Sequence, residues 1–176
     1  MDLVVAEGLI RQGVEPKARS SWTDLGCGRG LFTRALGNIL RDTQSTIYAV
    51  DIDTKTLQDV TIETPGVTLI RVSADFTKDL SSLPKVDGVL LANSFHYVKD
   101  KTAFLVQLKK KLTLGGRIIM VEYDTNVPNT WVPYPVSGER LSELMQSVGF
   151  YCRILAEHPS IYHNGNIYSA LIQMSV

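Results

Sequence analysis

The sequence has 176 residues, and its 18 basic and 18 acidic side chains cancel. A neutral chain of this length fits one domain over residues 1–176 without nucleic-acid or membrane partners, with an N-terminal helical segment (1–19) before the core (20–176). It contains no apolar run long enough to cross a bilayer and no signal peptide, so a cytoplasmic protein is expected.

Residues 2–12 place their apolar side chains on one side of a helix, which Gly13 ends ahead of Pro16. We expect this helix to pack against the edge of a sheet. The next segment, residues 20–25, is unusually polar for a buried parallel strand. Its position before a glycine-rich turn, rather than its composition, predicts a strand there.

The stretch Asp24-Leu25-Gly26-Cys27-Gly28-Arg29-Gly30 joins this strand to a helix, predicted from apolar residues that recur on one face between residues 31 and 40. Glycine tolerates positive φ and lets a ligand approach the backbone. The free N–H groups at the start of the helix favour an anionic group. A tight turn without a ligand is the alternative explanation.

The two cysteines, Cys27 and Cys152, lack the spacing of metal ligands, so no metal site is expected. Cys27 has no histidine or aspartate fixed beside it in sequence to activate a thiol. We therefore expect it to be a small loop residue rather than a nucleophile.

Residues 46–50 predict the second strand, and Asp51 at its end lies about 20 residues after the glycine loop, where an acidic residue reaches ribose hydroxyls. The dinucleotide fingerprint G-x-G-x-x-G would need a glycine at Leu31, whereas this loop runs G-x-G-x-G. The two features indicate an adenosine ligand with a group other than pyrophosphate at the helix end. Asp53 is better explained as the cap of the next helix.

The acid-led glycine loop resembles the first motif of the class I S-adenosylmethionine-dependent methyltransferases, and later segments resemble that family in the same order, from about residue 20 to the C-terminus. The nearest likeness is to small-molecule members with a type 11 or type 25 methyltransferase domain. The resemblance implies S-adenosyl-L-methionine as cofactor, with Asp51 on its ribose and Ile52 against its adenine. The methionine part would lie on the loop residues Asp24, Gly26, Cys27, Gly28 and Gly30.

Residues 67–72 predict the third strand. The resemblance implies that Asp75 and Phe76, which follow it, contact the adenine, although a turn cap is the alternative role for Asp75. The fourth strand, residues 86–92, is nearly all apolar and therefore central. Because ligands of open α/β sheets bind beyond the carboxyl ends of the strands, Asn93 is expected at the cofactor.

Three aromatic residues follow Ser94, and we expect Phe95 and Tyr97 to face the methyl acceptor. His96 is either a wall residue or the general base for an acceptor that must lose a proton. The other histidines, His158 and His163, fall in a predicted C-terminal hairpin.

The next helix is predicted to start near Asp100, and Gly115-Gly116 to turn into a fifth strand at residues 117–122. The loop from residue 123 to residue 135 should cover the acceptor side with Tyr123 and Trp131. A helix capped by Ser137 follows. Strands 150–156 and 167–174 are joined through residues 158–166 and should therefore be antiparallel.

These elements predict an α/β fold: a doubly wound, mostly parallel seven-stranded sheet of the Rossmann-like type, with one antiparallel strand near the C-terminus. Methyl transfer from a sulfonium needs proximity, alignment and a dry site rather than a nucleophile or a catalytic triad. The absence of a recognisable triad is therefore compatible with this chemistry.

The aromatic residues on the acceptor side favour a small, partly apolar molecule as the methyl acceptor. The stretch after the fourth strand is not of the Asn-Pro-Pro-Tyr type, which disfavours amino methylation of nucleic acids or glutamine. A nicotinamide-dependent oxidoreductase and a non-catalytic cofactor-binding subunit that needs a partner are the alternatives. A homodimer is compatible with the sequence.

Overall fold

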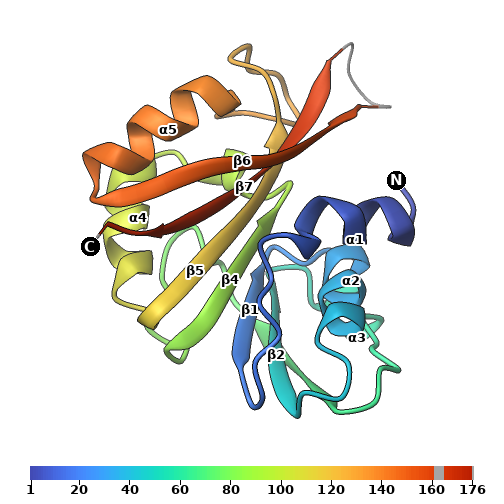
Figure 1. The fold of residues 1–176 in the computed structure, drawn as a ribbon. Coiled ribbons are helices and arrows are strands. Elements are labelled where there is room, and N and C mark those ends of the chain that lie inside the picture. The colour runs from blue at the N-terminus through green and yellow to red at the C-terminus, as the bar shows by residue number, and fades with distance from the viewer. Residues whose placement is uncertain (161–164, 176) are drawn as a thin grey trace.

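The computed structural model describes residues 1–160 and 165–175, and its seven strands form one sheet in the order β3-β2-β1-β4-β5-β7-β6 (Figure 1). Neighbouring strands are parallel except where β7 pairs with β5 and with β6, which is the predicted fold class. The strands are β1 (Ser21–Leu25), β2 (Ser45–Asp51), β3 (Val67–Ser73), β4 (Val86–Ala92), β5 (Leu112–Tyr123), β6 (Phe150–Pro159) and β7 (Asn166–Met174).

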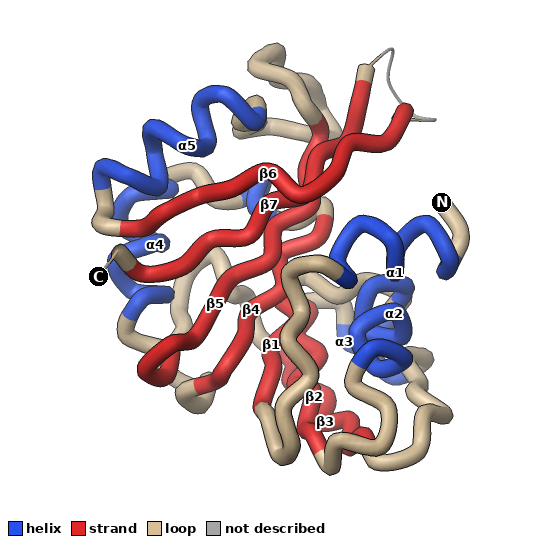
Figure 2. The backbone as a smooth tube through the Cα atoms, in the orientation of Figure 1, coloured by secondary structure: helices blue, strands red, loops and turns tan. Residues whose placement is uncertain are grey.

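Helices cover both faces of the sheet, with α1, α2 and α3 on one face and α4 and α5 on the other (Figures 1 and 2). They are α1 (Leu3–Arg11), α2 (Leu31–Ile39), α3 (Thr54–Gln58), α4 (Lys101–Lys109) and α5 (Gly138–Ser147), with a short 3₁₀ helix η1 (Phe95–Tyr97) after β4. Four of them begin with a side chain that accepts a hydrogen bond from a first-turn N–H: Asp2, Asp53, Asp100 and Ser137.

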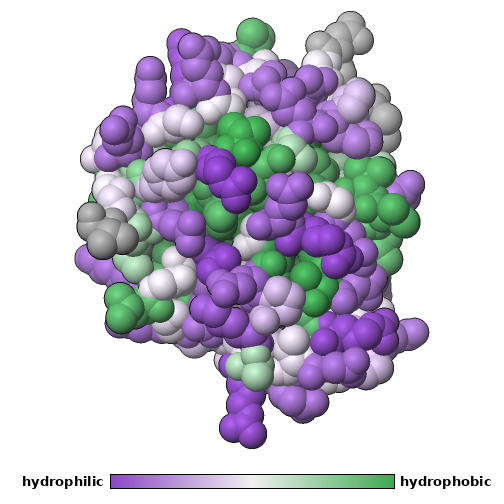
Figure 3. All heavy atoms as spheres, viewed as in Figure 1, coloured by the Kyte–Doolittle hydropathy of each residue, from purple (hydrophilic) through white to green (hydrophobic). Residues whose placement is uncertain are grey.

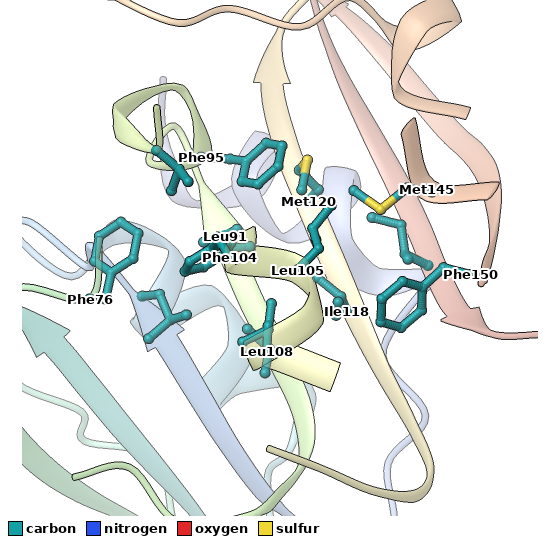
Figure 4. Close-up of a cluster of buried hydrophobic side chains, with 14 of the residues drawn as sticks. Phe76, Leu91, Phe95, Phe104, Leu105, Leu108, Ile118, Met120, Met145 and Phe150 are labelled. Atoms are coloured by element: carbon teal, nitrogen blue, oxygen red, sulfur yellow. The ribbon is translucent and has the colours of Figure 1, made fainter. Parts of the chain in front are cut away.

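Each face of the sheet has its own hydrophobic core. The larger core lies between the sheet and helices α4 and α5, and Figure 4 shows aromatic and aliphatic side chains of β4, β5 and α4 meeting there. The second core joins helices α1 and α2 to the other face. Burial of a large apolar side chain contributes roughly 1.5–3 kcal/mol, so these two layers fix the strand ends at which a ligand would bind.

The polar first strand is explained by its neighbour β4. Asp87 accepts hydrogen bonds from the backbone N–H and the hydroxyl of Ser21, at 2.8 and 3.0 Å. The ring of Trp22 lies over Gly88, where an added Cβ would come within 2.3 Å of it. A strand that looks too polar is therefore stabilised from the side, and the predicted strand is confirmed with a start at Ser21.

The structure corrects two predicted boundaries. Gly115-Gly116 does not precede the fifth strand but lies within β5, where the register shifts between the pairs Val86–Leu112 and Gly88–Arg117. The positive φ of Gly115, 77°, allows this irregularity inside a strand. In the C-terminal hairpin, β6 continues to Pro159, so His158 belongs to a strand rather than to the connection. His163 lies outside the described residues.

The surface carries hydrophobic patches that hydrophilic side chains interrupt, on the face seen in Figure 3. Within residues 1–160 and 165–175, none of the helices is long and apolar enough to span a bilayer.

Candidate functional site

A cavity of about 500 Å³ lies at the carboxyl ends of the parallel strands, the edge at which open α/β sheets bind ligands. The loops after β1, β2, β3 and β4 all contribute to its wall, so residues far apart in sequence meet around one space. The cavity is lined by Gly26, Gly28, Asp51, Ile52, Ala74, Asp75, Phe76, Thr77, Asn93, Ser94 and Tyr97.

The three glycines of the loop have positive φ, but the space beside them differs. A Cβ at Gly26 would lie 2.7 Å from the Cβ of Ser94, and one at Gly30 would lie 2.6 Å from a methyl group of Val60. Gly28, at φ 50°, has open space where a Cβ would stand, and it lines the cavity. Gly26 and Gly30 are therefore required by packing, while Gly28 leaves room for a ligand against the backbone.

Asp51 connects the glycine loop to the end of β2. Its two carboxylate oxygens accept hydrogen bonds from the backbone N–H groups of Gly28 (2.8 Å) and Asp53 (2.9 Å), and the residue lines the cavity. Asp53 instead caps α3, because its side chain accepts from the backbone N–H of Lys55 and of Thr56. The prediction that Asp53 is a helix cap is confirmed.

Asp24 lies beneath the glycine loop and is only 1 % exposed. The hydroxyl of Thr33 donates to its Oδ2 at 2.6 Å, and within the described part of the chain its buried Oδ1 has no partner. Burial raises the pKa of Asp24 to about 7, an effect that the Thr33 hydrogen bond opposes and the charge of Asp51 reinforces. An acid so placed can respond to a positive charge brought into the loop.

Asn93, directly after β4, is held in an uncommon conformation. Its φ is 53°, and its backbone N–H donates to the carbonyl of Val121 at 2.8 Å. Among the described residues, neither the side-chain oxygen of Asn93 nor the hydroxyl of Ser94 has a hydrogen-bond partner, although both atoms are buried. Leaving such a group unpaired costs about 1–3 kcal/mol, so polar groups of a ligand in the cavity fit this wall.

The outer wall of the cavity combines apolar and acidic groups. Ile52 is 66 % exposed, and Phe76 is buried, with its ring edge-on to Phe104. Asp75 accepts hydrogen bonds from the N–H and hydroxyl of Thr77, which together with Lys78 hold the pKa of its carboxyl below the usual value. Asp75 therefore caps its own turn and also lines the cavity, while its contact with an adenine stays a prediction.

Some predicted site residues lie away from this cavity. Phe95 does not face an acceptor but is fully buried against Phe104 in the larger core, because η1 turns its ring inward (Figure 4). Cys27 packs with apolar residues of α3 and β2, and burial raises the pKa of its thiol, so it remains protonated. Trp131 is 77 % exposed in the loop that follows β5.

His96 forms a buried pair with a residue that the sequence did not reveal. Its Nδ1 lies 2.8 Å from one carboxylate oxygen of Glu122, and its backbone N–H donates to the other at 3.2 Å. The centroid of the His96 ring lies 4.3 Å from that of the Tyr97 ring and 6.0 Å from that of the Tyr123 ring. In the sequence, Glu122 stood out only as an acidic residue at the end of the predicted fifth strand.

A second, smaller cavity of about 180 Å³ shares Asn93 with the first and extends toward the C-terminal hairpin. His96 does not line either of these two cavities. Across residues 1–160 and 165–175, no three histidine, cysteine or acidic side chains come close enough to hold a metal ion. The second cavity is lined by Met1, Leu31, Phe32, Asn93, Tyr123, His158, Pro159 and Ile167.

Solved structures share this fold at low sequence identity. The structure of a DhpI–SAH complex has a TM-score of 0.73 and 16% identity, over 98% of this chain and 84% of that one. A SAM-dependent methyltransferase from Aquifex aeolicus has a TM-score of 0.69 and 15% identity, over 96% and 89%. No curated protein sequence matches the chain.

A third structure is that of the 1,6-didemethyltoxoflavin-N1-methyltransferase of Burkholderia thailandensis, with bound 1,6-didemethyltoxoflavin and S-adenosylhomocysteine. Its TM-score is 0.68 and its identity 17%, over 99% of this chain and 78% of that one. In sequence, residues 23–120 match the family model described as "Methyltransferase domain". Because this segment is more than half of the sequence, the chain belongs to the family of methyltransferase domains, with the class I fold.

Proposed function

We propose that the protein is an S-adenosylmethionine-dependent methyltransferase that transfers a methyl group to a small, partly apolar molecule by in-line displacement. The observation that carries this proposal is the contact between Gly28 and Asp51. The open backbone of Gly28 and the carboxylate of Asp51 lie side by side on the wall of one cavity. A ligand with an adenosine and a charged tail needs both groups: the carboxylate for its ribose and the open backbone for its tail.

The residues of the large cavity fit the parts of this cofactor. Asp51 would accept hydrogen bonds from the ribose hydroxyls, and Ile52 and Phe76 offer apolar surface for the adenine, beside Asp75. The methionine part would lie on the glycine loop, above the buried carboxyl of Asp24. The unpaired oxygen of Asn93 is available to its ammonium group.

S-adenosylmethionine, when bound, supplies a methyl group already activated on a sulfonium. The chain then has to align donor and acceptor and exclude water, effects that contribute up to roughly 7–11 kcal/mol. Asn93 lines both cavities, so it can hold a ligand group at their junction.

A small molecule is favoured as acceptor by the size of the second cavity and its mainly apolar lining. The Burkholderia enzyme with this fold acts on 1,6-didemethyltoxoflavin, a small molecule, which supports the same class of acceptor here. The cytoplasmic location and the homodimer both stay predictions; cell fractionation and analytical ultracentrifugation test them.

Calorimetric titration with S-adenosylmethionine, S-adenosylhomocysteine and NAD tests the cofactor. We expect the first two to bind and NAD not to bind, and the reverse result would favour an oxidoreductase. Incubation of a metabolite extract with methyl-labelled S-adenosylmethionine tests catalysis. Label that enters a small molecule only in the presence of the protein supports an enzyme, whereas cofactor binding without any transfer supports a non-catalytic subunit.

A further inference from the structure

The second cavity brings a histidine of the C-terminal hairpin to the same space as Asn93. Most of its wall is apolar, and the polar side chains that described residues contribute to it are those of Asn93, Tyr123 and His158. Its volume, about 180 Å³, is below the roughly 300–1,000 Å³ of pockets for drug-sized ligands, which fits one ring with small substituents.

The proton on the His158 ring can be placed from one contact. Nδ1 lies 2.8 Å from the carbonyl oxygen of Pro159, and since a carbonyl oxygen can only accept, Nδ1 carries the hydrogen. In the neutral ring Nε2 then has the lone pair. No described residue makes a hydrogen bond to Nε2, so a ligand can do so.

His96 is placed differently. Its Nδ1 is taken by the carboxylate of Glu122, both side chains are almost completely buried, and the ring lines neither of the two cavities. Of the two histidines that the structure describes, His158 is therefore the one with access to a ligand beside Asn93. Among the described residues, the other titratable side chain on the wall of the second cavity is the phenol of Tyr123.

We propose that the second cavity binds the methyl acceptor, a single-ring aromatic molecule with an acidic O–H or N–H, and that His158 takes the proton of that group. The inference rests on the proposed methyl transfer. The accepting atom bonds to the methyl carbon while the sulfonium–methyl bond breaks and its electron pair goes to sulfur. The proton of the acceptor goes to Nε2 of His158 and from there to water.

Binding of a phenol to the protein loaded with S-adenosylhomocysteine tests this inference. The probe is 4-methylphenol, and 4-methylanisole, which lacks the O–H, is its matched control. We expect 4-methylphenol to shift the NMR signals of the His158 ring in a saturable way and to bind more tightly than 4-methylanisole. The signals are assigned by their loss in His158→Gln.

Two variants on the same strand separate the role of His158 from general effects on the hairpin. His158→Gln should weaken the binding of 4-methylphenol about tenfold, while Arg153→Gln, at an exposed position of β6, should not change it. S-adenosylhomocysteine should bind both variants like the unchanged protein, which also verifies their folding.

The two levels of the proposal fail in different ways. If the unchanged protein does not bind S-adenosylhomocysteine, the proposed function is wrong. Normal binding of S-adenosylhomocysteine, with equal affinity of both variants for 4-methylphenol or with unshifted His158 signals, would overturn the role of His158 alone.

Discussion

The imidazole of His96 and the carboxylate of Glu122 lie 2.8 Å apart at the ends of the two central strands β4 and β5, and both side chains are at most 3 % exposed. Glu122 also accepts the backbone N–H of His96, so one carboxylate fixes both the ring and the start of η1. We infer that this pair positions the residues after β4, in particular Tyr97, which lines the large cavity.

The first prediction concerns the energetic role of this pair. Glu122→Leu leaves the ring and backbone N–H of His96 buried without an acceptor, which should lower the free energy of unfolding by about 1–3 kcal/mol. Glu122→Gln retains an oxygen acceptor and should cost less. Urea unfolding of the two variants measures the difference, and equal losses would show that the hydrogen bonds contribute little.

The second prediction concerns the open position of the glycine loop. Gly28→Val places a branched side chain in the space beside the backbone and should abolish binding of S-adenosylhomocysteine. The positive φ adds strain of about 1–3 kcal/mol, so thermal unfolding must show that the variant is folded at the assay temperature.

Gly8→Ala is a suitable control for this variant, because Gly8 is exposed in α1 and an added Cβ meets no atom within 4 Å. Its binding of S-adenosylhomocysteine should equal that of the unchanged protein. If the Gly28→Val protein is folded and binds S-adenosylhomocysteine normally, the cofactor does not bind at the glycine loop.

The glycine loop and Asp51 could be predicted from the sequence because a motif of adjacent residues and a fixed distance along the chain describe them. Contacts between distant segments could not. Glu122 lies 26 residues after His96, and nothing local indicates that the two side chains meet. The inward turn of Phe95 depends on η1, and the position of His158 depends on how far β6 extends, which packing decides.

The third prediction separates the two acids after β2. Asp51→Ala should weaken cofactor binding by at least about tenfold, because a charge-assisted hydrogen bond contributes roughly 1.5–3 kcal/mol and the variant also releases the N–H of Gly28. Asp53→Ala removes the cap of α3 and should lower the stability of the protein with little effect on binding. Calorimetry measures cofactor binding and urea unfolding measures stability for both variants. Weaker binding by Asp53→Ala than by Asp51→Ala would mean that the two roles are exchanged.

The last prediction is a pH dependence of stability that comes from Asp24. Burial raises the pKa of this carboxyl from 3.8 to about 7 in the folded protein, so the folded state holds a proton that the unfolded chain releases. The resulting contribution to stability is complete below about pH 4 and is lost as the pH rises through 7.

Asp24→Asn removes this titration and keeps an oxygen that can accept from Thr33. Relative to the unchanged protein, the variant should therefore gain stability as the pH rises, by about 2–4 kcal/mol between pH 4 and pH 8, since one pKa unit corresponds to about 1.4 kcal/mol. Urea unfolding of both proteins at intervals over this range measures the gain.

Thr33→Val is the matched control, because it removes the hydrogen bond but leaves the buried carboxyl. The stability of this variant should still fall toward high pH. A difference between Asp24→Asn and the unchanged protein that stays constant from pH 4 to pH 8 would mean that Asp24 is ionised throughout.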